Sequence, residues 1–188
     1  MKEQEKHDWT QFEVGIYIKA RPDTVFELLS TGEGLAKWFL RNADFVPSSD
    51  GPPAKGNKAK LPPIALDQAR AENEPCRLND RYLWEWYYDG GTSGEGWMLE
   101  VRPPTRLRFT FGSGMEIEIS VRKQGAWCVV DLRQFKIPDT PKGRWEMHMG
   151  CRVAWSFFLT NLKSVAERGP DLRETERSRT KLLHLVNI

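Results

Sequence analysis

The sequence predicts an α+β fold in which an antiparallel β-sheet carries a long C-terminal helix. From residue 81 to residue 135, apolar side chains recur at every second position, and glycine-bearing turns separate the runs. This pattern is typical of an antiparallel meander with one face in solvent. Near the C-terminus the apolar spacing changes to four and three, so a long amphipathic helix must lie on the sheet.

The N-terminal part is predicted to form one strand and two short helices. Residues 11–20 alternate apolar and polar side chains, as a half-buried strand does. Pro22 suits the first turn of one helix, and Thr31 can cap a second helix that ends on Trp38 and Phe39.

Residues 47–80 differ in composition from the rest of the chain. They hold six of the twelve prolines and few large apolar residues. We therefore expect an irregular insertion with few anchors, with one short strand near residues 58–61, and with residues 47–78 as the most mobile part of the chain apart from its ends. Such a segment is either a mobile surface loop or a lid over a binding site.

The meander and the first strand together predict a sheet of six or seven strands. The predicted runs of the meander are residues 81–88, 96–101, 105–111, 115–122 and 126–135, with a turn at 89–96. In the run 96–101, the alternation places Trp97, Leu99 and Val101 on one face.

The last predicted helix spans residues 150–168 and ends at a Gly-Pro stop signal. Its apolar positions are Cys151, Trp155, Phe158, Leu162 and Val165. The tail, residues 174–188, is first charged and then apolar, so it forms either a second docked helix or a frayed end.

This order of elements is that of the helix-grip fold, in which a curved sheet wraps the last helix. Three stretches carry a closer resemblance: IKARPDTVFELLSTGEGLAKWF (18–39), GEGWMLEVRPPTRLRFTF (94–111) and GCRVAWSFFLTNLKSVAERGPDLR (150–173). They resemble the START-like (SRPBCC) superfamily, which includes the birch pollen allergen. Within it, the branch of the activator of heat-shock-protein-90 ATPase homologue is most similar. The resemblance implies one domain over residues 1–173 and a hydrophobic pocket between sheet and last helix, but no single reaction.

Composition argues against several classes of function. The formal charge is +2 and the charges are scattered, which disfavours nucleic-acid binding. The three cysteines are far apart and suggest neither a disulfide framework nor a zinc ribbon. The N-terminus is charged where a signal peptide would be apolar, and no apolar run approaches the roughly 20 residues of a membrane span. We therefore expect a cytoplasmic protein.

The sequence offers no catalytic constellation, no metal-ligand spacing and no cofactor motif. His148 is either an acid, base or ligand-binding group, or a surface or capping residue. Arg152 either pairs with a ligand carboxylate or forms a rim salt bridge. Glu85 is expected to face solvent.

The strand 81–88 places four rings on one face, those of Tyr82, Trp84, Trp86 and Tyr88. They are either plain core or the wall of a pocket. Because buried indole N–H and phenol O–H groups each need a partner, we favour the pocket for some of them. The predicted lining residues are Trp38, Phe39, Tyr82, Trp84, Trp86, Trp97, Phe109, Phe111, His148, Arg152, Trp155 and Phe158.

Three functions fit these expectations. The first is a binding module for an apolar or amphipathic small molecule, held between sheet and last helix. The second is a protein-interaction module of the chaperone-ATPase-activator type. The third is an enzyme of the cyclase or dehydratase kind, which the missing triad and metal motifs disfavour. A monomer and a homodimer are both compatible with the sequence.

Overall fold

The computed structural model describes residues 7–53, 62–87, 93–112, 114–176 and 179. Within these residues, seven strands form one antiparallel sheet in the order β1-β7-β6-β5-β4-β3-β2. The strands are β1 (Phe12–Ile18), β2 (Asn42–Val46), β3 (Arg81–Glu85), β4 (Ser93–Arg102), β5 (Arg106–Phe111), β6 (Met115–Gln124) and β7 (Trp127–Phe135). The predicted curved sheet of six or seven strands is confirmed.

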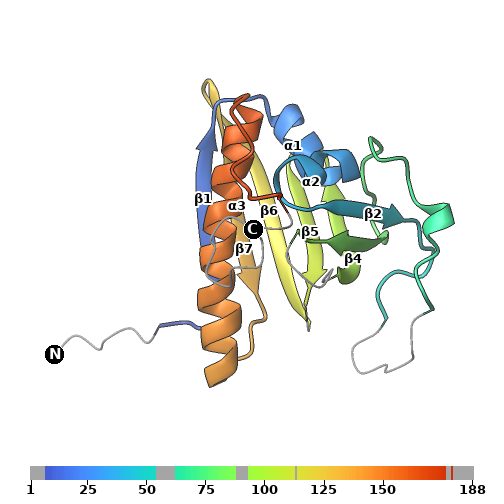
Figure 1. The fold of residues 1–188 in the computed structure, drawn as a ribbon. Helices are drawn as coiled ribbons and strands as arrows, with labels where there is room; N and C mark the ends of the chain where they lie inside the picture. Colours follow the sequence, from blue (N-terminus) through green and yellow to red (C-terminus); the bar gives the residue numbers. More distant parts are fainter. Residues whose placement is uncertain (1–6, 54–61, 88–92, 113, 177–178, 180–188) are drawn as a thin grey trace.

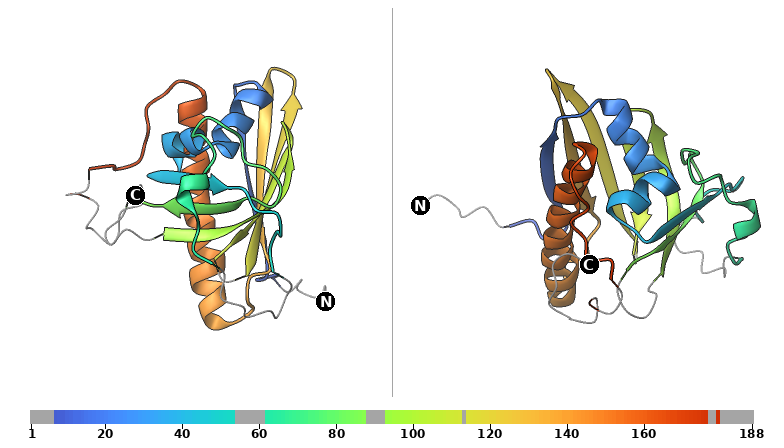
Figure 2. Two further views of the ribbon diagram at one scale, coloured as in Figure 1. Left: turned by 90° about the vertical axis from the view of Figure 1, so that its right-hand side faces the viewer. Right: turned by 45° about the horizontal axis from the view of Figure 1, so that its top comes forward.

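The three α-helices lie on the same face of the sheet, and α3 runs along it beside β1 and β7 (Figures 1 and 2). The short helices α1 (Pro22–Ser30) and α2 (Gly32–Trp38) follow β1, as predicted. Thr31 caps α2, because its Oγ1 accepts a hydrogen bond of 2.9 Å from the backbone N–H of Gly34. The helix-grip arrangement is therefore present.

Helix α3 (Cys151–Ala166) buries the predicted stripe, with Trp155, Phe158 and Leu162 inaccessible or nearly so. It continues a π-helical segment, η2 (Gly143–Gly150), which the sequence analysis missed. The i→i+5 hydrogen bonds of a π-helix do not produce the repeat of 3.6 by which helices are recognised in a sequence.

Strand β2 was also not predicted. It is a five-residue edge strand that pairs with β3. Its buried Ala43 and Phe45 alternate with the polar Asn42 and Asp44, so the sequence shows no clear apolar run there. The predicted strand near residues 58–61 lies outside the described residues.

The expectation of few anchors in the Pro-rich insertion is wrong for residues 69–80. Arg70 donates two hydrogen bonds to the buried carboxylate of Asp80, at 2.6 and 3.0 Å. The backbone also reaches the helices, where Cys76 N donates to Ser30 O at 2.7 Å. A short helical turn, η1 (Leu66–Gln68), precedes this anchored part.

None of the described helices combines the length and hydrophobicity that a membrane span requires.

Candidate functional site

An aromatic cluster fills the space between the sheet and α3. Phe39, at the end of α2, lies at its centre: its ring centroid is 5.5 Å from that of Trp84, 5.0 Å from that of Trp155 and 4.8 Å from that of Phe158. Of the twelve predicted lining residues, the structure brings nine together here: Trp38, Phe39, Tyr82, Trp84, Trp86, Phe109, Phe111, Trp155 and Phe158. Tyr88 lies outside the described residues.

Two glycines of β4 allow the rings of Tyr82, in β3, and of Trp86, just after β3, to lie against the sheet. A Cβ at Gly96 would come within 2.5 Å of the Tyr82 hydroxyl, and one at Gly94 within 2.8 Å of the Trp86 ring. The sequence analysis assigned these glycines to a turn at 89–96, but residues 93–96 are paired with β3. In this strand glycine marks a close approach of side chains rather than a change of direction.

An open groove leads into the aromatic cluster from the surface. Its volume is about 200 Å³, and it is lined by Phe39, Trp86, Phe111, Cys151, Ala154, Trp155 and Phe158. Ala154 is exposed on α3, so this side chain marks the outer edge of the groove.

A much smaller cavity lies deeper between the sheet and α3. Its volume is about 10 Å³, and its lining is Leu29, Leu35, Trp38, Phe39, Phe45, Trp84, Met98, Phe109, Ile119 and Trp155. Phe39 and Trp155 line both the groove and this cavity, so these two rings lie between the groove and the cavity. The pocket expected between sheet and helix is therefore mostly filled by rings in this conformation.

The buried rings carry N–H and O–H groups, and not all of these groups have a hydrogen-bond partner. Trp38 Nε1 donates to Leu28 O at 2.8 Å, Trp155 Nε1 to Gln134 Oε1 at 3.1 Å, and the Tyr82 hydroxyl to Thr110 O at 2.6 Å. Burial raises the pKa of Tyr82, so its hydroxyl keeps its proton. Trp84 Nε1 is also buried, but it has no hydrogen-bond partner among the described residues.

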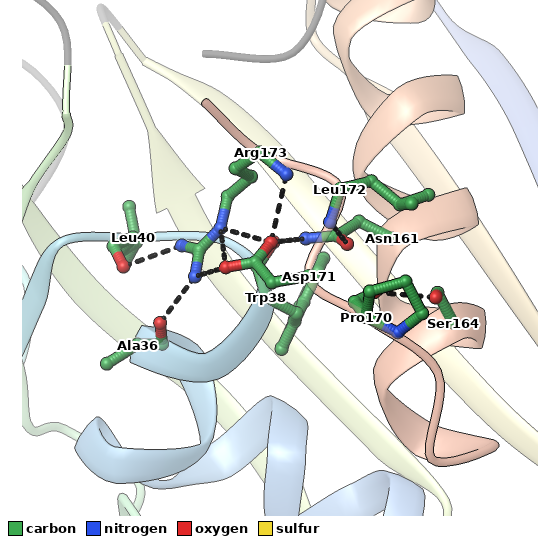
Figure 3. A network of polar contacts seen from close by, with 9 residues as sticks. All are labelled: Ala36, Trp38, Leu40, Asn161, Ser164, Pro170, Asp171, Leu172 and Arg173. Carbon is green, nitrogen blue, oxygen red and sulfur yellow. Dashed lines mark hydrogen bonds and ion pairs between the residues drawn. The ribbon is translucent and has the colours of Figure 1, made fainter. Parts of the chain in front are cut away.

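The backbone on both sides of Phe39 is held by α3 and the segment that follows it (Figure 3). Asn161 Nδ2 donates to Trp38 O at 2.7 Å, and Arg173 Nη1 donates to Leu40 O at 2.8 Å. Asp171 joins the two donors, because it accepts hydrogen bonds from both Asn161 and Arg173. This network fixes the backbone position of the ring that divides groove from cavity.

The sequence analysis assigned no role to these three residues, although one signal existed. Asn161 lies three residues after Phe158 and four before Val165, on the side of the helix predicted to be buried. It is fully buried in the structure, and a buried amide needs hydrogen-bond partners.

Trp97 lies outside the cluster, because it pairs with Arg81 and alternates with the core-facing Met98. A bulge between Met98 and Glu100 then interrupts the alternation in β4. Met98 faces the core instead, while Trp97 packs under the guanidinium of Arg81, 5.6 Å from the ring centroid. Only after the bulge does Val101 pack against the core. The predicted common face for Trp97, Leu99 and Val101 is therefore divided.

His148 and Arg152 also lie apart from the cluster. His148 is buried against the start of β1, with Nε2 3.0 Å from Gln11 O and its ring centroid 5.0 Å from that of Trp9. Burial lowers the pKa of His148, against the effect of the hydrogen bond to Gln11. Arg152 is exposed on α3.

The groove is chemically neutral. Cys151 is its one thiol, and burial raises the pKa of that thiol, so it remains protonated. No group of three metal-ligating side chains occurs in the part of the chain that the structure describes. This lining suits an apolar guest rather than an ion.

Comparisons with solved structures agree with the fold. The chain is similar to the protein SSP2350 from Staphylococcus saprophyticus, with a TM-score of 0.62 and 15% identity over 87% of this chain and 96% of that one. It is also similar to the Aha1 dimer from Colwellia psychrerythraea, with a TM-score of 0.59 and 17% identity over 85% and 97% of the two chains. A third similar structure is protein MLL2253 from Mesorhizobium loti, with a TM-score of 0.60 and 14% identity over 84% and 97%. A comparison with curated protein sequences found no relative.

The sequence itself matches a family model. The model is described as "Activator of Hsp90 ATPase homolog 1-like protein", and it matches residues 19–167. This span runs from the end of β1 to the end of α3 and includes most of the aromatic cluster. The chain therefore belongs to the Activator of Hsp90 ATPase homolog 1-like family.

Proposed function

We propose that this protein binds an apolar or amphipathic small molecule in the groove between the sheet and α3. The observation that carries the proposal is the lining of that groove, in which five of seven residues are aromatic. Rings that converge on an open, neutral hollow are how small-molecule sites are commonly built. An apolar guest would gain free energy by covering the rings that now line the open groove.

The size of the groove limits the guest. Its volume of about 200 Å³ is below the range of about 300–1,000 Å³ for drug-sized ligands. The guest is therefore small, or only one end of it enters. Since none of the described side chains that line the groove is charged, the part that enters is uncharged.

Filling the groove from α3 tests this proposal. We expect Ala154→Leu to weaken binding at least tenfold, because the added side chain occupies the outer edge of the groove. Ser156→Leu is the matched control, since Ser156 is exposed on the same helix but does not line the groove. The measurement is tryptophan fluorescence during titration with fatty acids, sterols and aromatic polyketides. The proposal would be contradicted if no compound of the panel changed the wild-type emission, or if Ala154→Leu and Ser156→Leu bound with equal affinity.

A second candidate function, contact with a protein partner, is favoured by a different surface. Trp145, Met149 and Val153 follow one another at intervals of four along η2 and α3, and are 75%, 42% and 62% exposed. Exposed apolar groups of this kind mark interaction sites when they are contiguous. The family description suggests the assay: the ATPase rate of a purified 90-kDa heat-shock chaperone, measured with the wild-type protein and with Trp145→Ser. Stimulation that the substitution abolishes would support this function, and equal rates without and with the protein would exclude it for that chaperone.

A further inference from the structure

Among the described residues, the buried N–H of Trp84 has no hydrogen-bond partner, and packing does not explain this feature of the aromatic cluster. Trp84 is 2% exposed, its Nε1 is buried, and its ring lines the inner cavity. A buried donor without a partner lowers the stability of the folded protein, because it loses its hydrogen bonds to water and gains none in return. The three neighbouring ring donors, on Trp38, Tyr82 and Trp155, each have a protein acceptor.

Water is a poor partner for this group. The inner cavity, about 10 Å³, is at the lower limit of the roughly 10–15 Å³ that one water molecule needs. A buried water also needs two to four polar partners. Apart from Trp84, the lining side chains are hydrocarbon, thioether and indole groups, and the other two indole donors are already engaged.

We infer that the inner cavity receives a neutral hydrogen-bond acceptor of the ligand, such as the oxygen of a ketone, and that Trp84 Nε1 donates to it. This inference rests on the proposed function, because the body of the ligand would occupy the groove. A carboxylate is disfavoured, since the described residues that line the two spaces include no cation to compensate for its lost hydration. The ligand class is therefore a small aryl or alkyl compound with an uncharged carbonyl or ether oxygen at its buried end.

The route from groove to cavity passes between Phe39 and Trp155. The Trp155 side chain is held by a hydrogen bond to Gln134, whereas the Phe39 side chain has no polar atom and contacts the neighbouring rings. The ligand therefore displaces the Phe39 ring, while the Asn161 and Arg173 hydrogen bonds keep its backbone in place.

The test is a cycle of two proteins and two probes. The probes are 1-acetylnaphthalene and its isostere 1-isopropenylnaphthalene, in which a methylene group replaces the ketone oxygen. The proteins are the wild type and Trp84→Phe, and the dissociation constants come from isothermal titration calorimetry. The cavity left by the smaller ring affects both probes alike, so it cancels in the ratio of their dissociation constants.

We expect Trp84→Phe to reduce the preference for the ketone by about three- to tenfold, which corresponds to one neutral hydrogen bond. Trp145→Phe, a matched change at an exposed position outside the groove, should leave the preference unchanged. An equal preference in wild type and Trp84→Phe would overturn the inference but leave the proposed function intact. If neither probe binds the wild type, the proposed function fails and the inference fails with it. Should Trp84→Phe not fold, the indole proton of Trp84 in the wild type decides: its NMR signal moves downfield with the ketone only, and equal shifts with both probes would overturn the inference.

Discussion

At the scale of single residues, Asp171 shows how the segment after α3 is fixed. Burial by itself would raise the pKa of this carboxyl group, but the hydrogen bonds from Arg173 and Asn161 outweigh that effect and hold the pKa below its ordinary value of 3.8. A carboxyl group with a lowered pKa in the folded state stabilises the protein above the pH at which it ionises in the unfolded chain. That stabilisation is lost as the pH falls through the folded-state pKa.

We therefore expect Asp171→Asn to lower the free energy of unfolding at pH 7 more than at pH 3. At neutral pH the wild type keeps the ion pair with Arg173, and as the pH falls through the folded-state pKa its carboxyl group takes up a proton and comes to resemble the amide. Urea denaturation at a series of pH values measures the difference between the two proteins. Asp67→Asn is the control, because Asp67 is exposed. A difference that stays constant from pH 7 to pH 3 would show that the ion pair contributes nothing.

Glycine and tryptophan in β4 show why single positions were misread from the sequence. Glycine is typical of turns. Gly94 and Gly96 nevertheless belong to a paired strand, in which they lie opposite Trp84 and Tyr82. Trp97 keeps the alternation of its neighbours in β4, but the bulge at residue 99 reverses the face of the residues that follow it, Val101 among them. Both errors depend on contacts across strands, which local periodicity does not contain.

At the scale of elements, α3 is the part of the fold that the sequence predicts best. The spacing of four and three identified both its buried face and its end, because a helix that packs on a sheet must repeat its apolar side chains in that way. The π-helical segment before it was missed for the same reason, since its repeat differs. Two buried side chains of the helix also form hydrogen bonds to the rest of the protein. Trp155 donates to Gln134, and Asn161 donates to the backbone oxygen of Trp38.

We expect Trp155→Ala to lower the free energy of unfolding by about 3–5 kcal/mol, as is usual when a buried ring is removed. Phe158→Ala should fall in the same range, because its ring is buried against Phe39. Trp145→Ala is the matched control: this ring is 75% exposed, so the expected change is within about 0.5 kcal/mol. Equal denaturation midpoints for Trp155→Ala and Trp145→Ala would show that α3 does not pack as described.

At the scale of the whole molecule, the architecture and the aromatic cluster could both be predicted, but the space inside the cluster could not. Periodicity indicates which side chains of a strand or helix face inward, and nine of the twelve predicted lining residues lie in one cluster. The remaining volume depends on the position of a single ring, that of Phe39, whose neighbouring backbone is held by hydrogen bonds from residues more than 120 positions away. No local pattern in the sequence contains that information.

The central claim is that the groove between sheet and α3 accepts an apolar guest, and a crystal structure of the protein with 1-acetylnaphthalene tests it most directly. We predict electron density for the naphthalene rings between Phe111 and Phe158, with the Phe39 side chain moved from its present contact with Trp155. Density for the compound only along Trp145, Met149 and Val153, or an empty groove at saturating concentration with Phe39 unmoved, would contradict the account.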